Sequence, residues 1–296
     1  MKNEKENKFR LHHVIENAMI LKNVDINFVQ FGTQTIFGFC SLKAYSQFER
    51  MIPDKIDRHD HVGQFLENVA PNSFAIIPSN KNWDERRKTI MKTIGINFAS
   101  QYISMMIETV DSWAKNLDVG QGIDFSFEVG KITFRIITKI LFGTDIDNMK
   151  KCMYIDPYGH SVSELNFEEA YFKYFKHEFE GFFKPIGKLF PFIEKYRLVE
   201  PYKTNLVNHN EINKTLKDFV DQSTDDQSVY RQMLNSGKLT KDEVFYDTML
   251  LLFAGFDTTS HTITSTLYYL HKYPACLQRL KADMKSQGIT DLDPSQ

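Results

Sequence analysis

The chain has 296 residues, enough for one large domain or two of ordinary size. Hydrophobic residues make up 42% and charged residues 25%, which allows a substantial core and argues against general disorder. The 36 basic and 38 acidic residues nearly cancel, to a net charge of −2, so the composition gives no electrostatic argument for nucleic-acid binding.

The cysteines and the N-terminus bear on the compartment. Cys40, Cys152 and Cys276 are odd in number and far apart, which predicts neither a disulfide framework nor a metal site and fits a reducing compartment. Met1 to Arg10 is rich in Lys and Glu and lacks the apolar run of a signal peptide. No later stretch supplies the roughly 20 apolar residues of a membrane span. As written, the sequence predicts a soluble, cytoplasmic chain.

The first 81 residues predict a small sheet flanked by helices. The expected elements are a helix at Phe9 to Leu21, strands at Ile26 to Phe31 and Thr35 to Cys40, a helix at Ser41 to Met51, and a long loop at Pro53 to Lys81 with a helical patch at Gln64 to Val69. His59-Asp60-His61 in this loop could suggest a metal site. Two histidines in a charged loop are more often solvated, so no metal site is predicted.

Asn82 is expected to open the next helix, where Trp83 and Arg87 are four residues apart and therefore share a face. An indole N–H beside a guanidinium could bind a carboxylate, but the same spacing permits an intrahelical cation–π contact. Positive charge also surrounds this helix, at Lys81, Arg86, Lys88 and Lys92. That charge could dock an acidic partner or form an ordinary solvated face.

The middle of the chain predicts further helices and an aromatic segment. The helices are expected at Phe98 to Leu117, at Asp124 to Phe142 with a stop at Gly143, and at Asn205 to Gln222, followed by a polar loop at Ser223 to Ser228. The segment Ala170 to Phe192 is dense in Phe and Tyr and is broken by Pro185 and Pro191. It could form a two-helix lid over an apolar pocket or an amphipathic surface on a membrane.

A single long helix is predicted from Thr240 to Tyr273. Thr240 and Glu243 form a capping box, apolar residues recur at helical spacing, and nothing interrupts the pattern before Pro274. A helix of this length spans roughly 50 Å at 1.5 Å per residue, so it is expected to be the central element of an α-rich domain.

The middle of this helix carries unusual residues. Gly255 lowers helix stability by about 1 kcal/mol relative to Ala, and beside Ala254 it leaves a shallow notch. Thr258 lies one turn on and can donate its hydroxyl to the Ala254 carbonyl, while Asp257 adds a carboxyl group. The notch could hold a flat group that receives protons. It could equally be a helix crossing that needs a glycine.

Ala254-Gly255-Phe256-Asp257-Thr258-Thr259 resembles the distal-helix signature of the cytochrome P-450 haem-thiolate monooxygenases. The following His271-Lys272-Tyr273-Pro274 and the short helix with Leu277, Leu280 and Lys281 also resemble that family. The resemblance implies a mainly α fold with a small N-terminal β-sheet. It divides the single domain 1–296 into a sheet and first helix (22–51), haem-propionate and core helices (82–143), an aromatic lid (160–222) and a distal helix (240–273).

The same resemblance implies roles for particular residues. Trp83 and Arg87 would bind a haem propionate, Ala254 and Gly255 would leave room for O₂, and Asp257 and Thr258 would deliver protons. The implied partners are a small apolar substrate, O₂ and an electron-donor reductase, with peripheral membrane contact as a further expectation.

The sequence departs from the family pattern after the distal helix. The family's cysteine-ligand loop and its Glu-x-x-Arg helix are not found there, and none of the three cysteines lies in such a loop. The resemblance thus covers about the N-terminal two-thirds of a typical member, and a fragment that is inactive alone is expected. A non-catalytic helical interaction protein is the alternative, and a membrane-surface protein acting through Ala170 to Phe192 is a third.

Overall fold

The structure is a computed structural model of the chain. It describes residues 24–31, 34–52, 55–57, 66–95, 100–117, 122–182, 184, 186, 190–222 and 225–289. The predicted helix at Phe9 to Leu21, the His59-Asp60-His61 stretch and a smaller part of the predicted loop around it lie outside these residues.

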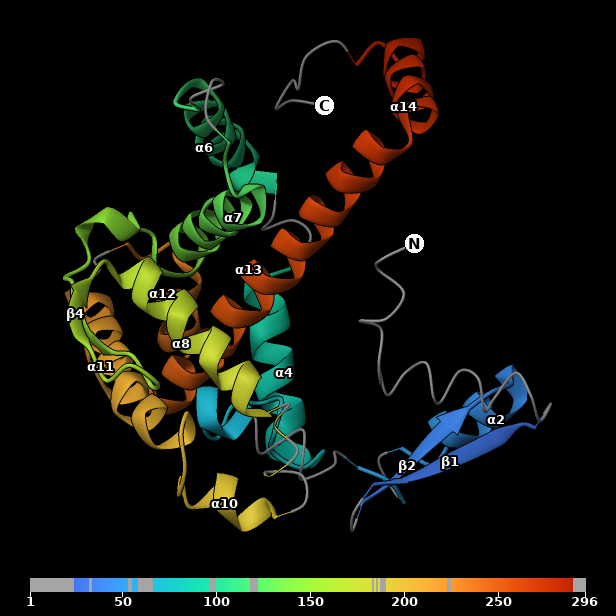
Figure 1. Ribbon diagram of the computed structural model, residues 1–296, viewed down its shortest axis with the longest axis vertical. Coiled ribbons are helices and arrows are strands. Elements are labelled where there is room, and N and C mark those ends of the chain that lie inside the picture. The colour runs from blue at the N-terminus through green and yellow to red at the C-terminus, as the bar shows by residue number, and fades with distance from the viewer. Residues whose placement is uncertain are drawn as a thin grey trace.

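The long helix α13 (Lys241–Lys272) runs through the molecule as predicted (Figure 1). The Thr240 side chain accepts from the Glu243 backbone N–H and the Glu243 carboxylate accepts from the Thr240 N–H, so the capping box is confirmed. At the other end, Pro274 starts α14 (Pro274–Ser286), since a proline fits the first turn of a helix and not its interior.

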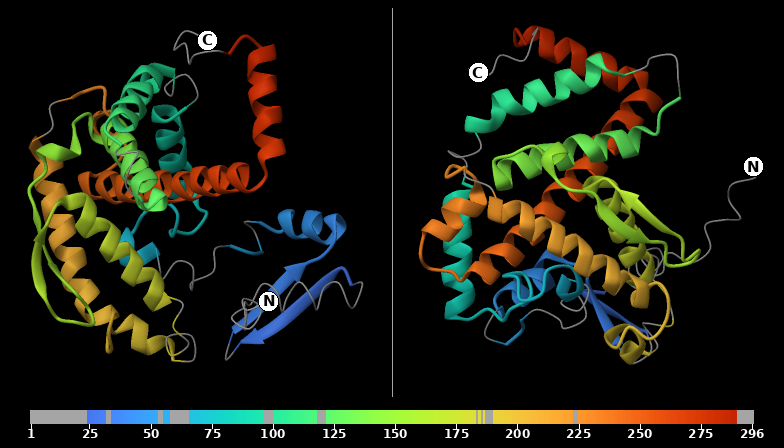
Figure 2. Two further views of the ribbon diagram at one scale, coloured as in Figure 1. Left: turned by 45° about the horizontal axis from the view of Figure 1, so that its top comes forward. Right: turned by 90° about the vertical axis from the view of Figure 1, so that its left-hand side faces the viewer.

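The predicted N-terminal sheet is an antiparallel hairpin. Strands β1 (Ile26–Phe31) and β2 (Gln34–Phe39) pair from Ile26–Phe39 to Phe31–Gln34, and the helix α2 (Leu42–Glu49) follows with Ser41 as its N-cap. Figures 1 and 2 show these elements set off from the helical body. The helical body therefore carries the candidate site.

Three helices lead from this hairpin to the centre. They are α4 (Lys81–Thr93), α6 (Ile103–Lys115), which follows the short 3₁₀ turn η1 (Ser100–Tyr102), and α7 (Phe125–Phe142). The α4 helix is capped by Asn80 rather than opened at Asn82, because the Asn80 side chain accepts from the Trp83 N–H. Gly143 ends α7 in the left-handed conformation (φ 72°), which confirms the predicted stop.

The region between α7 and α13 holds elements that the sequence reading missed. A second hairpin, β3 (Cys152–Ile155) with β4 (Val162–Leu165), follows the 3₁₀ turn η2 (Ile146–Asn148). The helix α12 (Val229–Asn235) lies between the predicted polar loop and α13, where no element was predicted. The remaining helices are α8 (Phe167–Phe182), α10 (Pro191–Lys195) and α11 (Tyr202–Gln222).

The hydrophobic core lies where α7, α8, α11 and the first half of α13 meet. Phe134 of α7 is fully buried, and its ring lies 5.0 Å from that of Tyr171 and 5.4 Å from that of Phe256. Tyr171, Tyr174 and Phe175 of α8 are buried as well. The first part of the aromatic segment is therefore core rather than membrane surface. No helix in the described part of the chain is both long enough and apolar enough to span a bilayer.

Candidate functional site

The middle of α13 presents one open face, formed by Ala254 and Thr258. Both residues are exposed. The Thr258 hydroxyl donates to the Ala254 carbonyl with an Oγ1–O distance of 2.7 Å, as the sequence predicts. The bond points the hydroxyl along the helix surface and leaves the small Ala254 side chain beside it. A flat group could approach the backbone here.

Gly255 faces a different direction, toward α7. A Cβ atom at this position would lie 2.8 Å from Cγ1 and 2.9 Å from Cδ1 of Ile137, so no larger residue fits without movement. The same crossing is joined by a hydrogen bond in which the Thr133 hydroxyl donates to the Phe256 carbonyl over 3.3 Å. The contacts of Gly255 are thus those of the alternative reading, a helix crossing that needs a glycine.

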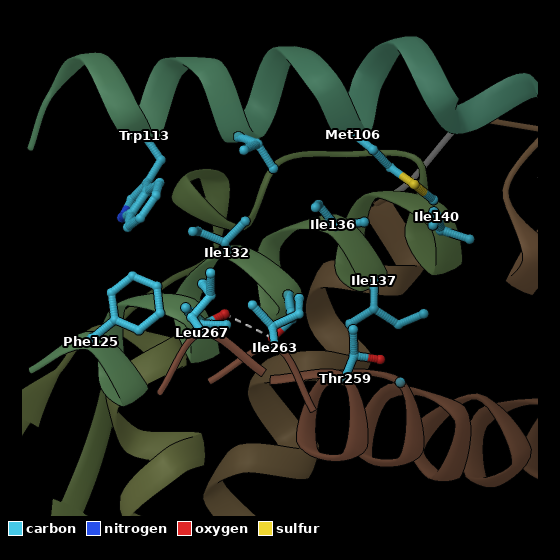
Figure 3. A pocket seen from close by; sticks show the side chains of 14 residues that line it. Met106, Trp113, Phe125, Ile132, Ile136, Ile137, Ile140, Thr259, Ile263 and Leu267 are labelled. Carbon is cyan, nitrogen blue, oxygen red and sulfur yellow. Dashed lines mark hydrogen bonds between the residues drawn. The ribbon is translucent and has the colours of Figure 1, made fainter. Parts of the chain in front are cut away.

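Beside this crossing lies an apolar pocket of about 580 Å³ between α6, α7 and α13 (Figure 3). Thr259, Ile263 and Leu267 of α13 line it together with Gly255. The facing walls are apolar side chains of α6 and α7, namely Met106, Trp113, Phe125, Ile132, Ile136, Ile137 and Ile140. The pocket therefore borders the side of α13 that carries Gly255, not the face that carries Ala254.

Asp257 occupies a third side of the helix, toward α8. Its Oδ1 lies 3.5 Å from Nδ1 of His261, and the same His261 nitrogen lies 2.8 Å from the Asp257 carbonyl oxygen. The Asp257 side chain is 29% exposed and that of His261 is 73% exposed. Burial raises the pKa of Asp257, and the nearby His261 opposes that rise. A carboxyl group with a raised pKa is suited to hold a proton and release it.

Trp83 and Arg87 lie one turn apart on α4, as their spacing predicts. The Arg87 guanidinium carbon is 5.6 Å from the centre of the Trp83 ring, so the intrahelical cation–π contact is present. Arg87 is nevertheless exposed and makes no ion pair with the acidic side chains of the described residues. Its guanidinium can still bind a carboxylate while it lies over the indole.

The neighbouring Arg86 has a different role from the one expected. It was expected among the basic surface residues, but its side chain is only 2% exposed. The Arg86 Nε and Nη2 atoms donate to the two carboxylate oxygens of Asp247, over 3.1 and 2.6 Å. Asp247 also accepts a hydrogen bond from the Phe74 N–H over 2.7 Å. This bidentate pair fixes α4 to α13. Sequence reasoning missed it, although an aspartate inside the apolar stripe of α13 was a usable signal.

The rest of the basic surface is partly neutralised. Lys88 Nζ lies 2.6 Å from the Asp84 carboxylate and Lys81 Nζ lies 3.9 Å from that of Glu85, both at the i, i+4 spacing. With Arg86 buried, the expected surface reduces to these paired lysines, Arg87 and Lys92.

Comparison with known proteins places this arrangement in a family. The sequence model of the family described as Cytochrome P450 matches residues 29–288, which is most of the chain. The chain belongs to the cytochrome P450 family. The mainly helical fold with its small antiparallel sheets agrees with that assignment.

Individual relatives match over shorter stretches. The chain is 22% identical to cytochrome P450 3A40 of Oryzias latipes over 216 residues, which cover 68% of this chain and 43% of the relative. It is 26% identical to ent-kaurenoic acid oxidase 1 of Arabidopsis thaliana over 230 residues, covering 74% and 42%. A putative cytochrome P450 133B2 of Xylella fastidiosa is 47% identical over 47 residues, covering 16% and 12%. The chain spans less than half the length of these cytochrome P450 relatives.

The residues present fit the haem that the cytochrome P450 family implies. The Ala254–Thr258 face is open and lined by small side chains, and the exposed Arg87 guanidinium offers donors suited to a propionate, whereas the Trp83 Nε1 atom is buried. Within the described residues, no group of three or more His, Cys, Asp or Glu side chains could hold a metal ion by itself.

Proposed function

We propose that this chain forms the distal wall of a haem-dependent monooxygenase that inserts one oxygen atom of O₂ into a small apolar organic substrate. The observation that carries the proposal is the Thr258 hydroxyl bound to the Ala254 carbonyl on an open face of α13, in a chain of the cytochrome P450 family. When bound, haem would supply the iron that activates O₂ with electrons from a reductase.

The contribution of α4 in this proposal is to hold the ring. The Arg87 guanidinium would bind one propionate as a charged donor, and the Trp83 indole N–H, buried in this structure, would turn toward the same propionate as a neutral donor. The buried Arg86–Asp247 pair fixes the distance between α4 and α13, so the propionate contact and the Ala254 face keep a constant separation. The small methyl group of Ala254 would leave room for O₂ on this face of α13.

Thr258 and Asp257 would control protons. The Thr258 Oγ1 proton is held by the Ala254 carbonyl and must leave that carbonyl before it can be donated on the open face. Asp257 lies on the α8 side, where burial raises the pKa of its carboxyl group and favours the protonated form. Its proton can be replaced from solvent through the exposed His261 imidazole, whose Nδ1 is 3.5 Å away. General acid catalysis of this kind contributes about 10²- to 10⁴-fold to a rate.

The test is to join this chain to the C-terminal part of a relative such as cytochrome P450 3A40, load the product with haem, reduce it and add carbon monoxide. The characteristic cytochrome P450 Soret band is expected. In that protein, Thr258→Ala should lower product formation about 100-fold. Thr262→Ala should not, because the Thr262 hydroxyl makes the same kind of bond, to the Thr258 carbonyl at 2.8 Å, one turn further on.

A folded fusion that binds haem and never gives this band would contradict the monooxygenase proposal. If the chain stays helical by circular dichroism and takes up no haem at all, a non-catalytic helical interaction protein is the remaining function.

Membrane contact belongs to the same proposal, since a patch of exposed apolar side chains surrounds α10. Its members are Ile186, Phe190, Phe192, Tyr196 and Leu198, each between 41% and 65% exposed. Aromatic side chains with lysines among them are typical of the membrane interface. Phe190→Ser with Phe192→Ser should reduce co-sedimentation with liposomes, whereas Tyr268→Ser with Tyr269→Ser, at an exposed pair on α13, should not. Equal loss in both double variants would argue against a specific patch.

A further inference from the structure

A second pocket, of about 940 Å³, lies between α7, α8 and α13, on the side of α13 that carries Asp257. Its apolar surface comes from five phenylalanine rings, those of Phe127, Phe172, Phe175, Phe179 and Phe256. The rings contact one another, with centroids 6.0 Å apart for Phe127 and Phe172 and 5.3 Å apart for Phe172 and Phe256. Aromatic faces of this kind carry negative electrostatic potential.

Two of the charged groups around this pocket already make hydrogen bonds within the protein. Lys184 Nζ donates to the Glu200 carbonyl over 3.1 Å and lies 4.9 Å from the centre of the Tyr158 ring. Asp124 caps α7 by accepting from the Phe127 N–H over 3.2 Å.

Asp257 is different, because its carboxylate lines the pocket beside Phe256 and pairs with the exposed His261, at 3.5 Å. Glu180 adds a second carboxylate to the wall and Lys176 an ammonium group. A half-buried carboxylate among aromatic rings is an environment that a cation would stabilise.

We infer that this pocket binds an organic amine, with its ammonium group at Asp257 and its hydrocarbon part among the five rings. The ammonium would make a charge-assisted hydrogen bond to the carboxylate and a cation–π contact with the neighbouring rings. A carboxylate ligand of the same shape would face Asp257 and Glu180. The pocket lies on a different side of α13 from the open Ala254–Thr258 face. Asp257 belongs both to this pocket and to the proposed proton delivery, but amine binding is measured without haem and is therefore tested separately from monooxygenase activity.

The charge of Asp257 gives the inference a pH signature. Burial raises the pKa of Asp257, and a bound ammonium would lower it, so the amine binds the ionised form more tightly. Amine affinity should therefore fall as the pH falls through the pKa of Asp257. The other titratable or charged groups facing the pocket are Asp124 at the N-cap of α7, Lys176 and Glu180 from α8, Lys184 just after α8, and His261 from α13 itself.

The experiment is isothermal titration calorimetry on the full chain with three probes of one shape: 2-phenylethylamine, 2-phenylethanol and 3-phenylpropanoate. The amine should bind about 10-fold more tightly than the alcohol at neutral pH, and the carboxylate more weakly than either. Asp257→Asn should lower the affinity for the amine to that for the alcohol. Asp242→Asn, an exposed acid at the start of the same helix, should leave the preference intact.

The wild-type chain provides a check that does not depend on any variant folding. The amine affinity should decline at acidic pH while that of the uncharged alcohol stays level. Equal affinities for amine and alcohol, a preference that survives Asp257→Asn in a folded variant, an amine affinity that does not change with pH, or no binding of the amine would each overturn the inference.

Discussion

The two halves of α13 share one helical pattern but have different surroundings. Between Lys241 and Phe256 the helix buries an apolar stripe that includes Val244, Met249 and Leu252. Beyond Ser260 it exposes large apolar side chains at Ile263, Leu267, Tyr268 and Tyr269. Figures 1 and 2 show this second half, with α14, extending away from the helices that cover the first half.

The contrast shows that the spacing of apolar residues in the sequence predicts a helix but does not predict which part of it is buried. The first half is held by tertiary contacts, as most helices in proteins are. The second half depends more on its own backbone hydrogen bonds and on helix propensity. The signature Ala254 to Thr259 lies at the boundary between the two halves. Substitutions on either side of it should therefore have different consequences.

The largest effect is expected from Asp247→Ala in the buried half. The Asp247 side chain is 0% exposed, and its loss leaves the Phe74 N–H without its acceptor and the buried Arg86 guanidinium with only the Glu243 carboxylate, 3.6 Å from Nη1. Breaking a buried pair in this way costs about 3–5 kcal/mol. The free energy of unfolding, measured by urea denaturation with circular dichroism, should fall by that amount.

A matched control is Asp84→Ala, which breaks the exposed pair with Lys88 on the same α4 helix and should change stability by less than about 1 kcal/mol. In addition, replacing both buried partners with apolar residues, as in Arg86→Met with Asp247→Leu, should recover much of the loss. Equal effects of Asp247→Ala and Asp84→Ala would show that burial does not determine how much an ion pair of α4 contributes to stability.

A second prediction concerns the cost of burying the charge of Glu168 in the packed helical core. Glu168 of α8 is 13% exposed, its Oε1 has no hydrogen-bond partner among the described residues, and Arg135 is no closer than 3.9 Å. Burial raises the pKa of Glu168 to about 7, only partly opposed by Arg135. In the unfolded chain its pKa is about 4.5. Between these values the folded state binds the extra proton, so stability falls as the pH rises from 4.5 through 7.

Glu168→Gln should remove this pH dependence. The variant should be more stable than the wild type above pH 7, by on the order of 3 kcal/mol for a shift of this size, and nearly equal to it below about pH 4.5. Urea denaturation at pH 4 and pH 8 measures both limits. If the difference between variant and wild type is the same at the two pH values, Glu168 is ionised in the folded protein and the region accommodates charge.

Much of this fold could be predicted from local signals. The capping box at Thr240, the glycine stop at Gly143 and the proline at Pro274 fix helix ends through backbone chemistry, which acts over a few residues. The hairpin β3–β4 and the helix α12 were missed, because both are short and gain their stability from contacts with α7, α8, α11 and α13.

The sequence predicted which residues of the candidate site lie side by side on a helix, but not which neighbouring helix each of them faces. Trp83 with Arg87 and Ala254 with Thr258 follow from the four-residue spacing of a helix. Which side of α13 faces which neighbour depends on tertiary packing, so the sequence could not show that Gly255 contacts Ile137 while Asp257 faces α8. The Arg86–Asp247 pair joins residues 161 positions apart and has the same origin.

The smallest effects are expected when a small residue is replaced by alanine in each half of α13. Alanine is the best helix former, so Gly255→Ala and Ser265→Ala both gain helix propensity, by about 1 and about 0.5 kcal/mol. At Gly255 the added methyl group would lie 2.8 Å from Ile137 Cγ1, and such overpacking costs about 1–3 kcal/mol. At the exposed Ser265 no neighbour opposes the gain.

Gly255→Ala should therefore lower the free energy of unfolding by about 1 kcal/mol, whereas Ser265→Ala should raise it by about 0.5 kcal/mol. Combining Gly255→Ala with Ile137→Ala makes room for the methyl group, so the pair should cost less than the sum of the single substitutions. A gain in stability at both positions would mean that α7 moves easily away from Gly255. The crossing would then not require a glycine, and the small residue would have to be explained by the open side of the helix.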